Sequence, residues 1–207
     1  MSNYASRTNS NSYPLTKKIS TMQFKRSFLA IFLLLPFLWT SCDDDPEPEN
    51  PEELITTVLL TLSPDGAGTP VVFSFQDLDG EGGNAATITT DPLAANTTYS
   101  AAVTLLNETE SPVENITEEV EEEDDEHQFF LLPSANLKLD WSYLDQDADG
   151  HPVGLLLQVV TKEASSGDLT LILRHLPDKG ASGVAEGNID NAGGETDIEV
   201  TFPVTIQ

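Results

Sequence analysis

Six residues from Asp145 to Gly150 have the types and the spacing of a calcium-binding loop. The stretch reads Asp145-Gln146-Asp147-Ala148-Asp149-Gly150, so acidic side chains stand at alternate positions before a glycine. Alternate aspartates can turn their oxygen atoms toward one point, and a glycine allows the sharp turn that such a loop needs. An EF-hand would require a glutamate where this chain has Leu156, so we expect a calcium loop on a β scaffold. The alternative is an ordinary turn, because Asp and Gly favour turns.

A looser version of this pattern lies between positions 77 and 84. It contains Asp77, Asp79, Glu81 and Asn84, whose side-chain oxygen atoms are suitable ligands for a second Ca²⁺. We expect calcium at either loop to have a structural role, and an ordinary turn is again the alternative.

Two histidines could form a different kind of metal site. His127 and His175 each lie at the end of an expected strand, next to Glu126 and Arg174. If the two strands are neighbours, His127, His175 and Glu126 could bind zinc or copper. Single, separated histidines are more often surface or packing residues, which is the competing interpretation. We expect His151, beside the aspartate loop, to be a turn residue.

The segment from Glu118 to Glu126 contains eight acidic residues in nine positions. It lies between two expected strands, so we predict a protruding loop or hairpin arm. Such a run is usually a solvated surface, and the functional alternative is capture of cations or of a basic partner.

The sequence contains no recognisable catalytic motif. It has no nucleophile motif, no glycine-rich phosphate loop between a strand and a helix, and no H-E-x-x-H pair. A hydrolase with a metal-assembled site is the least favoured hypothesis, and we expect a protein that is not an enzyme.

The elements that would position these groups follow a single cysteine, Cys42. Before it, Lys25 and Arg26 precede an apolar run of 12 residues from Phe28 to Trp39. A membrane-spanning helix needs about 20 residues, so this run fits the core of a signal peptide. Residues 1–41 are therefore expected to be removed, and Met22 is an alternative start.

The residues around Cys42 resemble a bacterial lipoprotein signal of the kind found in Bacteroidota, with Thr40-Ser41 before the cysteine. Trp39 stands where leucine is usual. The resemblance implies lipidation of Cys42, and the alternative is an ordinary signal that leaves a free thiol. Residues 42–53 are acidic and rich in proline, and we expect them to form a tether. The acids directly after Cys42 resemble a signal for export to the outer face of the outer membrane, and the periplasmic face is the alternative.

The charge of the chain changes sharply at the same cysteine. Only four of the nine basic residues, but all 35 acidic ones, lie after Cys42, which leaves a net charge of −31. Such a surface repels nucleic acid and attracts cations and basic partners. Because no cysteine remains beyond position 42, the folded part must be stable without disulfides.

The remainder, residues 54–207, alternates apolar and polar residues with many β-branched side chains, which predicts strands. Gly, Pro, Asn and Asp separate them, as in the expected turns 63–66 and 165–168. Eight or nine short strands indicate an all-β sandwich. The expected strands are 54–62, 71–76, 86–90, 98–106, 127–132, 137–143, 155–161, 169–175 and 196–206.

Residues Leu93 to Val103 resemble the corner motif of fibronectin type III and immunoglobulin-like domains, with Asn96-Thr97 followed by Tyr99. The resemblance implies that the Tyr99 hydroxyl bonds to the backbone upstream. In the last expected strand, Pro203 cannot donate a ladder hydrogen bond, which predicts an edge strand or a bulge.

Most of the chain after Cys42 also resembles a family of small Bacteroidota outer-membrane lipoproteins of unestablished function. The family-like stretches are 73–80, 125–130, 173–175 and 193–203. Relatives are often labelled "type 1 periplasmic binding fold", which implies alternating β and α units. The strand pattern here does not fit that label, so we favour the immunoglobulin-like sandwich.

We therefore expect a lipid-anchored, calcium-stabilised binding or interaction module, associated with an outer-membrane receptor or a basic protein partner. The alternative is a metal-capture lipoprotein that delivers an ion to an uptake receptor.

Overall fold

The computed structural model describes residues 54–80 and 83–207. The chain divides into two units, Met1–Glu47 and Pro48–Gln207, and all described residues belong to the second. The expected signal peptide, the start at Met22, the lipidated Cys42, the tether 42–53 and Glu81 lie outside the described residues. No helix within the described ranges is long and apolar enough to cross a membrane.

The described residues contain nine strands, which confirms the predicted all-β fold. Most boundaries lie close to the expected ones. The strands are β1 (Thr57–Pro64), β2 (Val71–Gln76), β3 (Thr87–Thr89), β4 (Thr98–Leu106), β5 (His127–Pro133), β6 (Leu139–Tyr143), β7 (Leu156–Thr161), β8 (Ser165–His175) and β9 (Glu195–Ile206).

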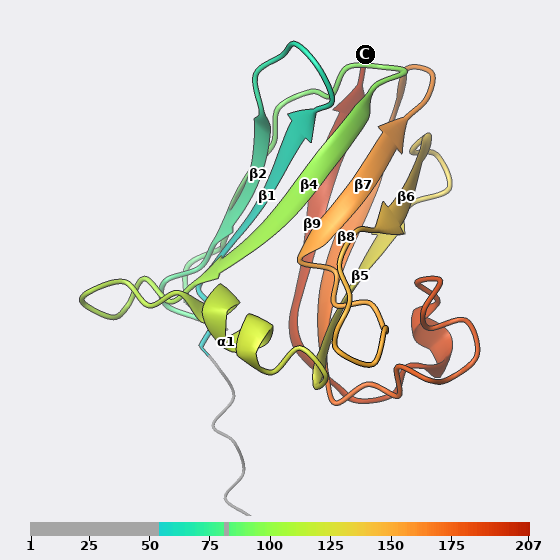
Figure 1. Cartoon of the computed structure of the whole chain (residues 1–207). Coiled ribbons are helices and arrows are strands. Elements are labelled where there is room, and N and C mark those ends of the chain that lie inside the picture. Colours follow the sequence, from blue (N-terminus) through green and yellow to red (C-terminus); the bar gives the residue numbers. More distant parts are fainter. Residues whose placement is uncertain (1–53, 81–82) are drawn as a thin grey trace, which may run out of the picture. The chain divides into compact units, whose positions relative to one another are not determined.

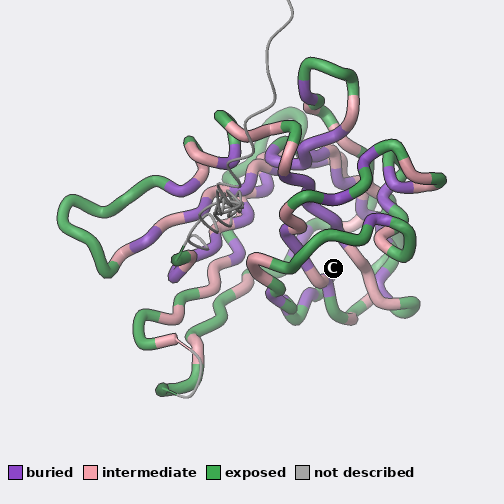
Figure 2. The backbone as a smooth tube through the Cα atoms, turned by 90° about the horizontal axis from the view of Figure 1, so that it is seen from below, coloured by how far each residue is buried: buried purple, intermediate pink, exposed green. Residues whose placement is uncertain are grey.

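The strands form two antiparallel sheets that pack face to face as a sandwich (Figure 1). The larger sheet has the order β3-β2-β1-β4-β7-β6, and the smaller has the order β5-β8-β9. Alternating side chains point inward because successive residues of a strand face opposite sides of a sheet. Figure 2 shows buried positions gathered within the fold and exposed ones along the loops.

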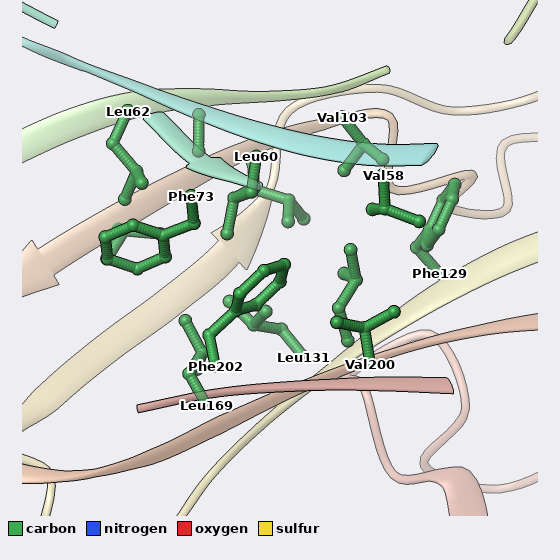
Figure 3. Packing of buried hydrophobic residues seen from close by; sticks show 14 of the residues in the cluster. Val58, Leu60, Leu62, Phe73, Val103, Phe129, Leu131, Leu169, Val200 and Phe202 are labelled. Carbon is green, nitrogen blue, oxygen red and sulfur yellow. The ribbon is translucent and has the colours of Figure 1, made fainter. Parts of the chain in front are cut away.

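The core lies between the two sheets and consists of aliphatic and aromatic side chains (Figure 3). Leu60 and Phe73 of the larger sheet face Leu131 and Phe202 of the smaller one, and all four are almost completely buried. The rings of Phe73 and Phe202 lie 5.7 Å apart, a favourable separation for an aromatic pair. This core stabilises a domain whose described residues include no cysteine.

The corner before β4 forms the hydrogen bond that the sequence predicts. The amide of Ala94 donates to the hydroxyl oxygen of Tyr99 at 2.8 Å. Nearby, Leu93 pairs with Ile206 at the end of β9, so the segment before β4 touches the smaller sheet while β4 belongs to the larger one. The Tyr99 hydroxyl thus holds the chain where it passes between the sheets.

We expect Tyr99→Phe to lower the free energy of unfolding by about 1 kcal/mol, because one partly buried hydrogen bond is lost and the ring stays in the core. Urea unfolding monitored by circular dichroism measures this change. A Tyr99→Phe variant as stable as the wild type would contradict a stabilising role for the hydroxyl.

The last strand, β9, lies at the edge of the smaller sheet, as Pro203 predicts. Pro203 pairs with Asp168 of β8, and its carbonyl oxygen accepts a hydrogen bond from the Thr90 hydroxyl at 2.8 Å. Because β9 has a neighbouring strand on one side only within the described residues, the missing N–H of Pro203 leaves no strand on the open side without a hydrogen bond.

Two sequence predictions about loops were wrong. The acidic run begins in a short helix, α1 (Ile116–Glu122), because Ile116 and Val120 are one helical turn apart and both are buried. The Thr117 hydroxyl oxygen accepts from the Leu105 amide at 2.8 Å, which attaches α1 to the end of β4.

The second error concerns residues 165–168, which we expected to be a turn but which form the start of β8. They pair with the end of β9, from Ile206 to Pro203. Gly167 leaves room there for the Ser134 hydroxyl, since a Cβ atom would lie 2.4 Å from its oxygen. Pairing with β9 thus outweighs the turn preference of the local sequence.

Candidate functional site

The aspartate loop is held together by hydrogen bonds from its own backbone. One carboxylate oxygen of Asp145 accepts from the Gly154 amide and the other from the Leu156 amide, both at 2.8 Å. Oδ1 of Asp147 accepts from the amides of Asp149 and His151, at 3.0 and 2.8 Å. The first two aspartates therefore close the loop, and their oxygen atoms point to backbone N–H groups.

The remaining oxygen of Asp147 binds a lysine from another part of the chain. Nζ of Lys179 lies 3.0 Å from Oδ2 of Asp147, and the ammonium also donates to the carbonyl oxygen of Asp124. Asp147 is 5% exposed and Lys179 is 6% exposed, so this is a buried ion pair. Burial alone would raise the pKa of Asp147, but the His151 amide and Lys179 outweigh it and hold that pKa below its usual value.

Calcium binding at the Asp145 loop stays a prediction. Asp145 and Asp147 are already used by N–H groups and by Lys179, and Asp149 is exposed. Within residues 54–80 and 83–207, no group of three or more His, Cys, Asp or Glu side chains is placed to hold a metal ion. The ammonium of Lys179 supplies positive charge at this loop.

Of the four predicted ligands of the second acidic loop, the structure describes Asp77, Asp79 and Asn84, and hydrogen bonds join them. Oδ2 of Asp79 accepts from the amide and from the side-chain nitrogen of Asn84, at 3.0 and 2.6 Å. These hydrogen bonds from Asn84 hold the pKa of Asp79 below its usual value. Asp77 accepts from the Gly80 amide at 3.0 Å. These hydrogen bonds hold the segment in a turn. Calcium binding at this loop stays a prediction.

The two histidines lie side by side, as the hypothesis of a shared site requires. His127 of β5 pairs directly with His175 of β8 across the smaller sheet. Their rings are stacked, with centroids 4.8 Å apart and planes 7° from parallel. Glu126 lies 3.6 Å from Nε2 of His175. The structure therefore brings all three predicted residues of this site together.

A carboxylate that we did not predict completes the cluster. Asp197 of β9 lies 3.8 Å from Nε2 of His127 and 4.0 Å from Nδ1 of His175. The backbone at Gly194 lies close to the backbone at His175, since a Cβ atom at Gly194 would be 2.3 Å from the His175 carbonyl oxygen. A β-bulge between Leu173 and Arg174 shifts the register just before His175. Asp197 could not be found from sequence because its position depends on this pairing.

The surroundings of His127 also favour one tautomer. Its Nδ1 lies 3.1 Å from the carbonyl oxygen of Glu123, and a carbonyl only accepts hydrogen bonds, so Nδ1 carries the proton. In the neutral ring, the lone pair is then on Nε2, which faces Asp197. Metal-binding histidines usually have this kind of second hydrogen bond. The cluster thus has suitable groups for a transition metal, although the stacked rings would have to turn to share one ion.

The aspartate loop, residues 145–150, borders an open cavity of about 540 Å³ that was not predicted from the sequence. Trp141 and Tyr143 of β6 form one wall, with ring centroids 4.9 Å apart at 82°. Two acidic residues line the cavity: Asp145 of the aspartate loop and Glu186 of the loop between β8 and β9. The signal was present in the sequence, since Trp141 and Tyr143 are two positions apart on a strand and share a face.

The cavity wall is fixed by buried hydrogen bonds. The Tyr143 hydroxyl donates to the Phe129 carbonyl oxygen at 2.7 Å and accepts from Nε2 of Gln128 at 3.0 Å. Gln128 also donates to the Val184 carbonyl oxygen, which connects β5 to the loop that carries Glu186. Burial raises the pKa of Tyr143, so its hydroxyl stays protonated and keeps its hydrogen bond to the Phe129 carbonyl oxygen.

Comparison with protein-family models, with curated proteins and with solved structures finds no match to this chain.

Proposed function

We propose that this chain is a non-enzymatic binding module of the cell envelope, anchored by lipid on Cys42 to the outer membrane and facing the cell surface. The charge of the chain carries the proposal. Four basic residues stand against 35 acidic ones after Cys42, and two of the four, Lys162 and Lys179, form ion pairs with aspartates. The excess negative charge favours cations and basic partners, including a receptor with a basic surface, and disfavours nucleic acid.

The position of α1 supports the same proposal. The helix and the acidic residues that follow it lie at one end of the sandwich, next to the end of β4 (Figure 1). Its apolar residues, Ile116 and Val120, face the core, so its acidic side chains are left for solvent or for a partner. We identify this acidic end as the surface that a basic partner would meet.

Protease treatment of intact cells tests the orientation. We expect external protease to remove the folded domain, because a surface lipoprotein is accessible without lysis. A chain that survives in intact cells and is degraded after lysis would place the module on the periplasmic side.

A second candidate function is transition-metal capture, and the stacked pair of His127 and His175 favours it. Two imidazole rings at 4.8 Å, with carboxylates of Glu126 and Asp197 within 4.0 Å of their nitrogens, are the ligand types that bind zinc. Ligands about 2 Å from one tetrahedral zinc ion lie ~3.3 Å from each other, so the parallel rings would have to turn before both could hold one ion.

We expect Zn²⁺ to bind the folded protein, and His175→Ala to weaken that binding by about tenfold or more, because one of two nitrogen ligands is lost. Isothermal titration calorimetry measures the affinity. His151→Ala, which removes a histidine outside the cluster, is the control for carboxylate binding elsewhere. Equal affinity of the wild type and His175→Ala would contradict zinc capture at this pair.

A further inference from the structure

The cavity beside the aspartate loop has the chemistry of a site for an organic cation. Among the described residues, its lining includes two acidic residues, Asp145 and Glu186, and no basic residue. Its volume of about 540 Å³ lies in the range of small-ligand sites. We propose that this cavity binds the guanidinium group of an arginine side chain in a partner peptide or protein.

The aromatic pair favours a flat cation. Trp141 and Tyr143 both line the cavity, and their rings meet nearly at right angles, with the edge of one ring against the face of the other. A guanidinium is planar, is weakly hydrated and stacks on aromatic faces. An ammonium group would gain the attraction to the π surface but would not stack in the same way.

The two carboxylates of the lining complement this group in different ways. Asp145 is fixed by the amides of Gly154 and Leu156, so it contributes an immobile negative charge. Glu186 is exposed on the loop between β8 and β9, and its carboxylate can pair with two N–H groups of a guanidinium. The cavity therefore combines stacking with a bidentate acceptor.

The site is also pre-organised, which lowers the entropic cost of binding. Tyr143 is held by Phe129 and Gln128, as described above. The Trp141 ring lies against Gly187, where a Cβ atom would be 2.6 Å from two ring carbons. Gly187 has a φ of +87°, which a side chain would strain. The glycine thus allows the ring to rest on the backbone of the loop that carries Glu186.

Trp141 provides a direct measurement. The sequence has two tryptophans, Trp39 and Trp141, so Trp141 is the sole one in a chain that begins at Cys42. Full-length protein with Trp39→Phe gives the same reporter if the leader is retained. We expect N-acetyl-arginine amide to change the Trp141 fluorescence with saturation, and the neutral isostere N-acetyl-citrulline amide to bind at least about fivefold more weakly.

Glu186→Gln is expected to weaken arginine-amide binding by about fivefold, since it removes one charge in contact with the ligand. Glu163→Gln removes the same charge from an exposed turn outside the cavity and should leave binding unchanged. This inference rests on the proposal that the chain is a binding module. Equal binding of the arginine and citrulline amides would overturn the cationic ligand but leave a binding cavity. No saturable change with either probe would overturn the cavity as a site.

Discussion

Asp147→Ala is expected to lower the free energy of unfolding by about 3–5 kcal/mol, because it leaves the Lys179 ammonium charged and buried without its carboxylate. The same substitution removes the acceptor for the amides of Asp149 and His151. Urea unfolding monitored by circular dichroism measures the change. An effect below about 1 kcal/mol, the usual value of an exposed ion pair, would show that the pair is not buried in solution.

Two control variants separate the ion pair from the loop as a whole. Asp149→Ala changes an exposed aspartate two positions away and should shift the stability by no more than about 0.5 kcal/mol. Asp147→Asn combined with Lys179→Met removes both charges, and it should be more stable than Asp147→Ala alone. Calcium at this loop stays a prediction, and if it binds there a chelator will lower the melting temperature of the wild type.

The contribution of Asp147 also depends on pH in a defined direction. Its pKa in the folded protein is lower than its ordinary value, about 3.9 in an unfolded chain. The stabilisation is therefore present above pH ~4 and is lost as the pH falls through the folded-state pKa. The difference in stability between wild type and Asp147→Ala should accordingly narrow in strong acid.

Much of the fold could be predicted because strands have a simple local signature. In β4 and β9, alternate residues are buried, and the same alternation is visible in the sequence. The helix α1 was missed because only Ile116 and Val120 mark its buried side, and the acidic residues between and after them suggest a solvated loop. The spacing of these two apolar residues was the one available signal.

The candidate sites could be predicted only in part, since their chemistry depends on distant partners. The aspartates of residues 145–149 were predicted to bind calcium, which stays a prediction. The ion pair of Asp147 with Lys179, 32 positions away, could not be predicted from the local sequence. We predicted a shared metal site only if the strands of His127 and His175 were neighbours, and β5 does pair with β8. The cavity was missed because Trp141 and Glu186 come together only in the folded chain.

Replacing Cys42 by serine is expected to move nearly all of the protein from the membrane fraction to the soluble fraction. Cys42 is the single cysteine of the chain and thus its one site for a thioether-linked lipid. Stable anchoring needs more than one acyl chain, and each buried CH₂ group contributes about 0.8 kcal/mol. Without the lipid, the acidic chain is repelled by anionic headgroups. Ser41→Ala keeps a small residue before the cysteine and is expected to leave the protein in the membrane fraction.

Lipid attachment at Cys42 is the claim on which the proposed function depends most. Metabolic labelling of cells with an alkyne fatty acid, followed by purification of the chain, tests it directly. We predict a labelled wild-type protein in the outer-membrane fraction and an unlabelled Cys42→Ser variant. An unlabelled wild-type chain, or label that persists in Cys42→Ser, would contradict the proposal of a lipid-anchored binding module.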